Sequence, residues 1–299
     1  MLYLKLPQLK KVISLFFILA IVYLSNAQVG IGTTEPDASA VLELQSTEKG
    51  FLPPRMTTTE RNAISNPAEG LTIYNTDTKC IQFFDIQFWI NVCDGVADVP
   101  TVIGANGVVW MDRNLGASRV ATSSNDMDSY GNLYQWGRAA DGHEKRNSPT
   151  YNAVLSTVGV ANFNNDSNNA WYGQFILRNS GNNNWVNPSV NGVNDLWQGV
   201  NGINNPCPKG FRLPTESEWD VELAGWSNAA GAFASILKLP AAGRRSTTNG
   251  DVGHTGSIGH YWSSTITSSN TRFHYFNINF KEMSFASRAS CYSVRCLKD

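Results

Sequence analysis

The sequence predicts an α+β fold for residues 96–299, preceded by a small β-rich segment at residues 28–95. Two patterns support this class. Residues 272–280 alternate apolar and polar side chains with a period of two, which is typical of a half-buried strand. Residues 215–218 form a capping box, and the apolar residues that follow share one helix face. We therefore expect both strands and helices in the larger region.

The first 27 residues have the three parts of an export signal. Lysines supply positive charge, residues 12–24 are almost wholly apolar, and the small residues at 25–27 suit cleavage after Ala27. An apolar stretch of 13 residues is shorter than the roughly 20 that a membrane-spanning helix needs. We expect a secreted or cell-surface protein, outside the cytoplasm, with no membrane span after signal cleavage.

Composition narrows the function classes. The signal carries three of the 23 basic residues and no acidic one, which leaves 20 basic against 24 acidic residues, a net charge of about −4. Nucleic acid is therefore not an expected partner. Charged residues make up 16% of the chain and Trp occurs nine times, a balance that favours an extracellular β-rich protein over a cytosolic enzyme.

Further elements are expected in both regions. The first region should hold strands at 40–44, 71–74 and 81–90 and a short helix at 58–64; the second should hold strands at 108–112, 133–137, 239–244 and 260–264, with helices from 215 and over 229–237. The first region has few large aliphatic residues and builds a thin core, which packing against copies of itself would relieve. Residues 151–205 are crowded with Asn and Gly, and long polar loops of that size are usually functional or disordered.

The first region resembles an N-terminal stalk found among exported proteins of Bacteroidetes-like bacteria and in fibre-like adhesins. The strings that carry the resemblance are VGIGTTEP (29–36), KGFLPPRMT (49–57), ERNAI (60–64) and GLTIYNTDT (70–78). The resemblance implies a structural spacer, a possible homotrimer, and no chemistry.

The second region resembles the Fibrobacter succinogenes major paralogous domain family and, behind it, the superfamily of formylglycine-generating enzymes and C-type lectin-like domains. The blocks that carry it are VWMDRNLG (109–116), YGNLYQWGR (130–138), CPKGFRLPTESEW (207–219), YWSS (261–264) and SVRC (293–296). The resemblance implies a C-type lectin-like α+β fold of twisted antiparallel strands with two helices and long loops. It implies no specific activity.

The five cysteines should be mostly paired in an exported chain, with one left over. Cys80 and Cys93 bracket a short hairpin-like segment. From the residues alone, Cys207 could pair with either Cys291 or Cys296 near the end. The resemblance identifies the final SVRC as a structural segment and so implies the Cys207–Cys296 pair, with Cys291 as the odd residue.

The patterns of known catalytic and metal sites are incomplete. HEKRN at 143–147 begins like the zinc motif H-E-x-x-H but has Asn in place of the second His. NDMD at 125–128 offers carboxylates for calcium but lacks the remaining ligands of a loop site. His254, His260 and His274 are interpreted as ordinary surface or strand residues. CYSVRC at 291–296 has the C-x4-C spacing of the formylglycine-generating enzymes, although the block order argues against that reading. We expect no catalytic residue, metal or cofactor.

The tryptophans divide into two groups. Those in the resembling blocks are assigned to the core, namely Trp110, Trp136, Trp219 and Trp262. The others lie in the Asn-rich loops, where Trp171, Trp185 and Trp197, together with Asn194 and Asp195, are candidates for a ligand-binding surface. The competing interpretation is that these three rings fill small cores beneath a long loop, in which case they should be buried.

The function predicted first is a non-enzymatic secreted or cell-surface adhesion protein, in which a stalk presents a lectin-like module to a carbohydrate or protein ligand. The alternative is a structural fibre or matrix component. A formylglycine-generating-type cysteine oxidase is the second alternative, and it would need Cys291 and Cys296 both free in a cleft.

Overall fold

The computed structural model of the chain describes residues 28–152, 159–178, 184–267 and 270–299. The predicted export signal at 1–27 lies outside these residues. The contacts divide the chain into two compact units, Met1–Pro54 and Arg55–Asp299, and each is described by itself. The predicted domain boundary near residue 95 stays a prediction.

The described part of the first unit is a short parallel strand pair without a core. Strand β1 (Val29–Ile31) pairs with β2 (Leu42–Leu44). Gly32 turns the chain with φ near +86°, and a Cβ there would lie 1.9 Å from the Gln45 carbonyl oxygen, so only glycine fits. Among the described residues of this unit only Pro53 is buried.

The second unit begins with a small sheet and one short helix. Helix α2 (Thr58–Asn62) starts at a capping box in which Thr57 and Glu60 bond each other's backbone N–H groups. The sheet runs in the order β3-β4-β5-β6, with the first pair parallel and the others antiparallel; the strands are β3 (Arg55–Met56), β4 (Thr72–Asn75), β5 (Cys80–Phe84) and β6 (Trp89–Asn91). The single strand predicted at 81–90 is thus two strands, because the Asp85 side chain accepts bonds from the backbone of Gln87 and Phe88 and forms a turn.

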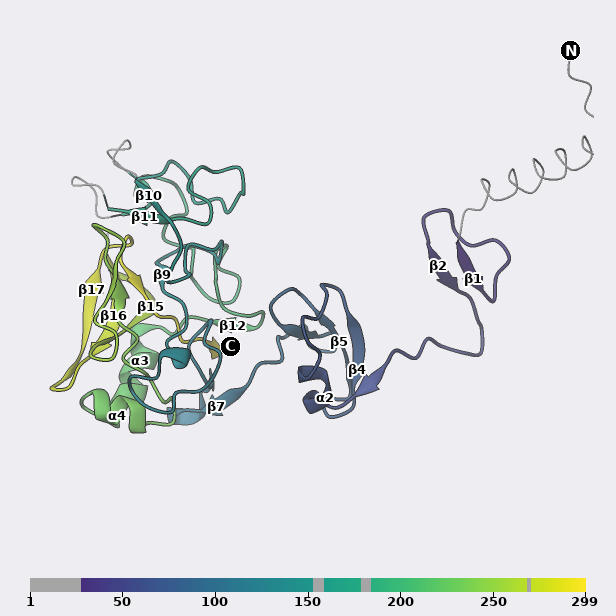
Figure 1. Cartoon of the computed structure of the whole chain (residues 1–299), viewed down its shortest axis with the longest axis horizontal. Coiled ribbons are helices and arrows are strands. Elements are labelled where there is room, and N and C mark those ends of the chain that lie inside the picture. Colours follow the sequence, from purple (N-terminus) through teal and green to yellow (C-terminus); the bar gives the residue numbers. More distant parts are fainter. Residues whose placement is uncertain (1–27, 153–158, 179–183, 268–269) are drawn as a thin grey trace, which may run out of the picture. The chain divides into compact units, whose positions relative to one another are not determined.

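The remainder of the second unit contains four more sheets (Figure 1). Two have four strands, in the orders β12-β19-β8-β7 and β14-β13-β18-β9, one has three, β15-β16-β17, and one has two, β10-β11. Their bounds are β7 (Thr101–Ile103), β8 (Val109–Met111), β9 (Tyr134–Gln135), β10 (Thr150–Asn152), β11 (Phe175–Leu177), β12 (Phe211–Arg212), β13 (Arg244–Arg245), β14 (Val252–Gly253), β15 (Gly259–Thr267), β16 (Asn270–Phe276), β17 (Lys281–Ala286), β18 (Cys291–Tyr292) and β19 (Leu297–Lys298). The helices are α3 (Glu216–Leu223) and α4 (Ala229–Ala234), with 3-10 turns η1 (Ala105–Gly107) and η2 (Met127–Ser129).

The predicted C-type lectin-like α+β fold is wrong. Strands occupy 27% of the chain and helices 10%, and among the described residues the strands form several small sheets with three short α-helices. The physical reason is that most of the described strands are only two or three residues long and are distributed over several sheets. Helices form near 216 and 229 as expected, but they do not accompany one large twisted sheet.

The period-two pattern at 272–280 also misled the prediction. Strand β16 ends at Phe276, and the Asn277 side chain then accepts bonds from the backbone of Asn279 and Phe280, which closes a turn. Ile278 is 72% exposed in that turn. The alternation of apolar and polar residues therefore continues beyond the strand into the hairpin connection, where Asn277 determines the geometry of the turn.

The core of the second unit combines aliphatic residues with many aromatic ones. Trp110, Trp136, Trp219 and Trp262 are all buried, which confirms their assignment to the core. Each of the last three donates its indole N–H to a backbone carbonyl, at 3.0 to 3.1 Å for Trp136 and Trp219. None of the described helices is long and apolar enough to cross a membrane.

Candidate functional site

The three loop tryptophans do not form the exposed surface that the sequence suggested. Trp171 is 5% exposed, and Trp185 and Trp197 are fully buried. All three belong to the largest hydrophobic cluster of the second unit. The prediction of exposed indole rings is therefore wrong, and the competing interpretation, in which the rings fill a core under the loops, holds.

Long-range polar contacts explain this burial. Trp185 donates its indole N–H to the Trp136 carbonyl at 2.7 Å, and Trp197 donates to the carbonyls of Arg138 and Asn204. The Arg138 guanidinium lies 4.9 Å from the Trp171 ring centre and 5.5 Å from that of Trp185. A buried indole needs a partner for its N–H, and for Trp185 and Trp197 the carbonyls of residues 136, 138 and 204 supply the partners.

The two polar members of the predicted surface do lie at the surface. Asn194 and Asp195 are exposed, next to the buried Trp197. The Asn194 side-chain oxygen accepts a hydrogen bond from Arg288, which anchors the loop to the chain before β18. The structure thus separates these two residues from the rings with which they were grouped.

Both predicted disulfides are confirmed. Cys80 is bonded to Cys93, and Cys207 to Cys296. Cys291 is the free cysteine; it is buried, and its thiol donates to the Leu133 carbonyl at 3.0 Å. Burial raises the pKa of the Cys291 thiol, despite three nearby arginines that act in the opposite direction. With Cys296 in a disulfide and Cys291 enclosed, the free cysteine pair that an oxidase would need is not formed.

The acidic side chains of the turn at 125–128 are paired with an arginine of the chain. Asp126 accepts two bonds from Arg119, at 2.8 and 3.2 Å, and further bonds from the backbone and hydroxyl of Thr122. These hydrogen bonds hold the pKa of Asp126 well below its usual range. Asp128 lies 3.2 Å from the same guanidinium. The carboxylates considered for calcium therefore neutralise a cation of the chain itself.

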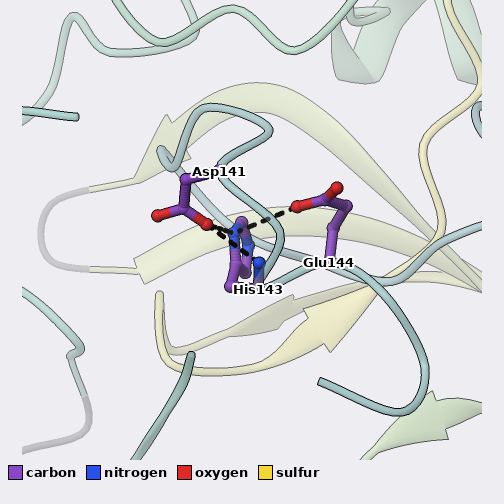
Figure 2. Close-up of side chains that lie close together, drawn as sticks. All are labelled: Asp141, His143 and Glu144. Atoms are coloured by element: carbon purple, nitrogen blue, oxygen red, sulfur yellow. Dashed lines mark hydrogen bonds and ion pairs between the residues drawn. The ribbon is translucent and has the colours of Figure 1, made fainter. Parts of the chain in front are cut away.

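One close cluster of ligand-type side chains includes two residues of the incomplete zinc motif. Asp141, His143 and Glu144 converge in the loop after β9, as Figure 2 shows, and are all buried. The His143 Nδ1 lies 2.7 Å from Asp141 Oδ1, and its Nε2 accepts the backbone N–H of Gln135 at 3.1 Å. The HEKRN string indicated His143 and Glu144, whereas Asp141, two residues before it, was missed in the sequence.

The bonding within the cluster indicates a structural clamp, since both ring nitrogens of His143 are engaged. Burial and the nearby Arg138 charge lower the pKa of His143 to about 4, so the ring is neutral near pH 7. Burial alone would raise the pKa of Asp141, but bonds from His143 and the Arg138 charge lower it to about 2. Arg138 bonds the second oxygen of Asp141 at 2.5 Å. A metal ion would have to displace both a buried guanidinium and a ring hydrogen bond.

Two further histidines are strand residues, one of the two interpretations given above, and both are buried. His260 and His274 do lie in strands β15 and β16, but they are 8% and 0% exposed. His260 stacks on Tyr292, with ring centres 4.9 Å apart, and His274 packs against Trp219 and Trp226. Burial lowers the pKa of each to about 3.

Apolar side chains gather on the surface of the N-terminal region instead. In the first unit the exposed ones are Val29, Ile31, Val41, Leu42, Leu44, Phe51 and Leu52, and each is between 44% and 78% exposed. Single exposed apolar residues are normal on a protein surface. Here, however, the strand pair β1–β2 and the segment after it have no core in which these side chains could be buried. This part of the chain buries little apolar area by itself.

The inner face of the sheet β3–β6 buries polar residues beside apolar ones. Asn75 and Gln82 on the strands and Arg61 on helix α2 are at most 3% exposed, and Ile73 and Trp89 are buried on the same side. The Arg61 guanidinium donates to Gln82 at 2.7 Å and to Asp98 at 2.5 Å, and Gln82 donates to Asn91 at 2.7 Å. Each of these bonds satisfies a group that would be costly to bury alone.

The opposite face of the same sheet carries apolar residues. Tyr74 lies across from Ile81, and Phe83 belongs to the same face by strand alternation. Ile81 is 41% exposed and Val92, which follows β6, is 57% exposed, whereas Tyr74 and Phe83 are half-buried. We call Tyr74, Ile81, Phe83 and Val92 the outer apolar face.

Comparison with known proteins identifies one region. No curated protein and no solved structure shows significant similarity to the chain. Residues 30–107 match the family model of the phage tail like trimerisation region, and this match includes β2, all of β1 except Val29, and the outer apolar face. A region of this kind fits a homotrimer and a structural or adhesive, tail-fibre-like role for the chain.

Proposed function

We propose that this chain is a secreted structural component of a fibre-like assembly, in which the N-terminal region forms a homotrimer and the C-terminal region is the displayed domain. The observation that carries the proposal is the outer apolar face within a segment similar to a trimerisation region. Of the two readings of the sequence, the structural one is favoured over a dedicated lectin.

The distribution of polarity in the sheet β3–β6 supports self-association. A single domain normally turns its apolar face inwards, because burial of apolar area contributes about 25 cal/mol per Å². Here the inner face already buries Ile73 and Trp89 together with the Arg61–Gln82–Asp98 network, yet Ile81 and Val92 on the other face stay in contact with water. A partner surface would cover the apolar residues without disturbing any of the inner hydrogen bonds.

The disulfides support an extracytoplasmic location. Two closed pairs among five cysteines are expected where thiols are oxidised and are rare in a reducing cytosol. This agrees with the export signal that the sequence predicts at 1–27. The proposal includes no catalysis, and the enclosed Cys291 and the clamped His143 support that part.

The test measures the mass of the mature chain, residues 28–299, in solution. Light scattering coupled to size exclusion at tens of micromolar should give three times the monomer mass, and a monomer at that concentration would contradict the proposal. Ile81→Glu should shift the mass towards the monomer, because it places a charge at the centre of the outer apolar face.

The matched control is Ile203→Glu, which makes the same change at a residue that is 72% exposed and lies outside the matched region. It should leave the trimer intact. Dissociation by both variants to the same extent would show that added charge, and not the outer apolar face, controls the mass. Each variant should keep the circular dichroism of the native protein.

A further inference from the structure

One cavity of the second unit lies where the β3–β6 sheet meets the loop that follows β8. Its volume is about 530 Å³, within the range of about 300–1,000 Å³ typical of small-molecule sites. Arg61, Phe88 and Asp98 line one side, and Met111, Arg113 and Ala117 line the other. We call this cavity the junction cleft.

The charged groups of the junction cleft are already paired. Arg61 bonds Asp98 at 2.5 Å, and Arg113 forms a two-pronged pair with Asp112 at 2.7 and 2.9 Å. The carboxylate raises the pKa of Arg113, so this pair stays ionised. With two cations and two anions bonded to each other, the cleft has no unpaired charge to attract an ionic ligand.

The remaining lining suits a neutral ligand with many hydroxyl groups. Phe88 and Met111 supply apolar surface, while Gln87 extends an exposed side-chain amide that makes no hydrogen bond to the described residues. An amide offers both donors and an acceptor, and paired carboxylates keep acceptor positions open. Sugar rings combine apolar faces with neighbouring hydroxyls and fit such a wall.

An extended peptide is a poorer match, since peptides bind by adding a strand to a free sheet edge. Strand β6, at the cleft, is covered: the Asn91 N–H bonds Val96, and the Asp98 N–H bonds the Trp89 carbonyl at 2.8 Å. Strand β8 lies between β7 and β19 and has no open side. The cleft therefore presents side chains and no free backbone ladder.

We propose that the junction cleft is a binding site for a neutral saccharide. The site goes beyond the proposed structural role and does not depend on trimer formation. It also lies apart from Trp171, Trp185 and Trp197, where the sequence suggested a ligand. A fibre component with this site would bind a glycan between the β3–β6 sheet and the loop that follows β8.

The test uses the mature chain and saturation-transfer NMR with three neutral probes: cellotriose, maltotriose and tri-N-acetylchitotriose. At least one probe should receive saturation, and the transfer signal should approach a plateau as the concentration of that probe is raised. Its affinity should change little between about 0.05 and 0.5 M NaCl, because screening acts on charged partners. An N-acetylated, amidated tripeptide should show no transfer. Failure of all three sugars, or selective transfer to the peptide, would overturn the proposal.

Two variants locate the binding. Ala117→Phe fills the cleft, and Gln87→Ala removes the unbonded amide from its wall; each should weaken the binding probe about tenfold or more. Asn201→Ala is the control, since Asn201 is exposed and lies outside the cleft lining. If Ala117→Phe fails to fold, Gln87→Ala alone decides. Unchanged affinity in Gln87→Ala and in a folded Ala117→Phe would place the sugar elsewhere and contradict the assignment.

Discussion

The sheet β3–β6 and the tryptophan-rich cluster of the same unit differ in what they leave exposed. The sheet and helix α2 bury a network of arginine, glutamine and asparagine beside apolar residues and leave Ile81 and Val92 in water. The cluster buries Trp185 and Trp197 completely and leaves Asn194 and Asp195 outside. The difference teaches that one part of a chain can bury its large apolar side chains by itself. Another part of the same chain leaves apolar side chains exposed, and a partner surface could bury them.

The strongest challenge to this comparison is truncation of a buried indole. Trp197→Ala should lower the free energy of unfolding by roughly 3–5 kcal/mol, because it opens a cavity and leaves two carbonyls without their donor. Denaturant titration measures the loss. Tyr172→Ala, at a residue 37% exposed, should cost far less, and the trimer mass should not change in either variant. A small effect at Trp197 would mean that the cluster is not the stabilising core.

Removal of the Cys207–Cys296 disulfide should have the next largest effect. The bond closes a separation of 89 residues, and loss of such a link typically costs about 2–5 kcal/mol. The double variant Cys207→Ala with Cys296→Ala should melt earlier while remaining associated through its N-terminal region. Dissociation of this variant would show that the two regions are not independent.

Acid should affect the two parts differently. The pKa values of His143, His260 and His274 are about 4, 3 and 3 in the folded chain, below the ordinary 6.5, because burial disfavours their charged form. Between these values the unfolded chain binds more protons, so stability falls as the pH drops below about 6.5, by up to about 1.4 kcal/mol per pH unit for each histidine. Thermal melts from pH 7.5 to 5 should show the aromatic region weakening.

A variant sharpens the acid experiment. His260→Phe keeps the stack on Tyr292 and removes one titrating group, so the slope of melting temperature against pH should decrease. The sheet β3–β6 contains no histidine, and trimer mass should hold over the same range. An unchanged slope in His260→Phe would contradict a buried, neutral His260.

The smallest expected effect compares two equivalent helix starts. Thr57 with Glu60, and Thr215 with Glu218, form the same capping box in the two parts. Thr57→Ala and Thr215→Ala should each cost about 1 kcal/mol. We expect Thr57→Ala to be masked while the trimer persists, since association stabilises the folded form, and to become visible only on dilution. Equal losses at all concentrations would argue against that linkage.

Local chemistry was predictable, and long-range assembly was not. The capping box before Trp219 could be recognised because its residues lie within four positions of one another. The four block tryptophans were assigned to the core because of the family resemblance. Trp185 and Trp197 were placed wrongly, because the carbonyls that receive their N–H bonds belong to residues 136 and 138, far away in the sequence. The pattern through Phe276 was misread for the converse reason, since Asn277 closes a turn that periodicity does not reveal.

The clamp around His143 shows why an incomplete motif can still indicate a compact cluster. The second histidine of the zinc motif is missing, but His143 still lies beside a carboxylate, since Asp141 bonds both the His143 ring and the Arg138 guanidinium. Which acid meets which base depends on how the loop after β9 turns. That information resides in tertiary packing and not in residue spacing.

The pairing of β8 with β19 has a consequence for the order of events during biogenesis. Leu297 lies opposite Trp110, so this sheet cannot form completely until the chain has been synthesised almost two hundred residues beyond Trp110. The strands β4, β5 and β6, by contrast, pair with near neighbours and can form as soon as they emerge. We expect the N-terminal regions of different subunits to associate early, before the later strands have paired. Trimer assembly would then precede complete folding of the C-terminal region.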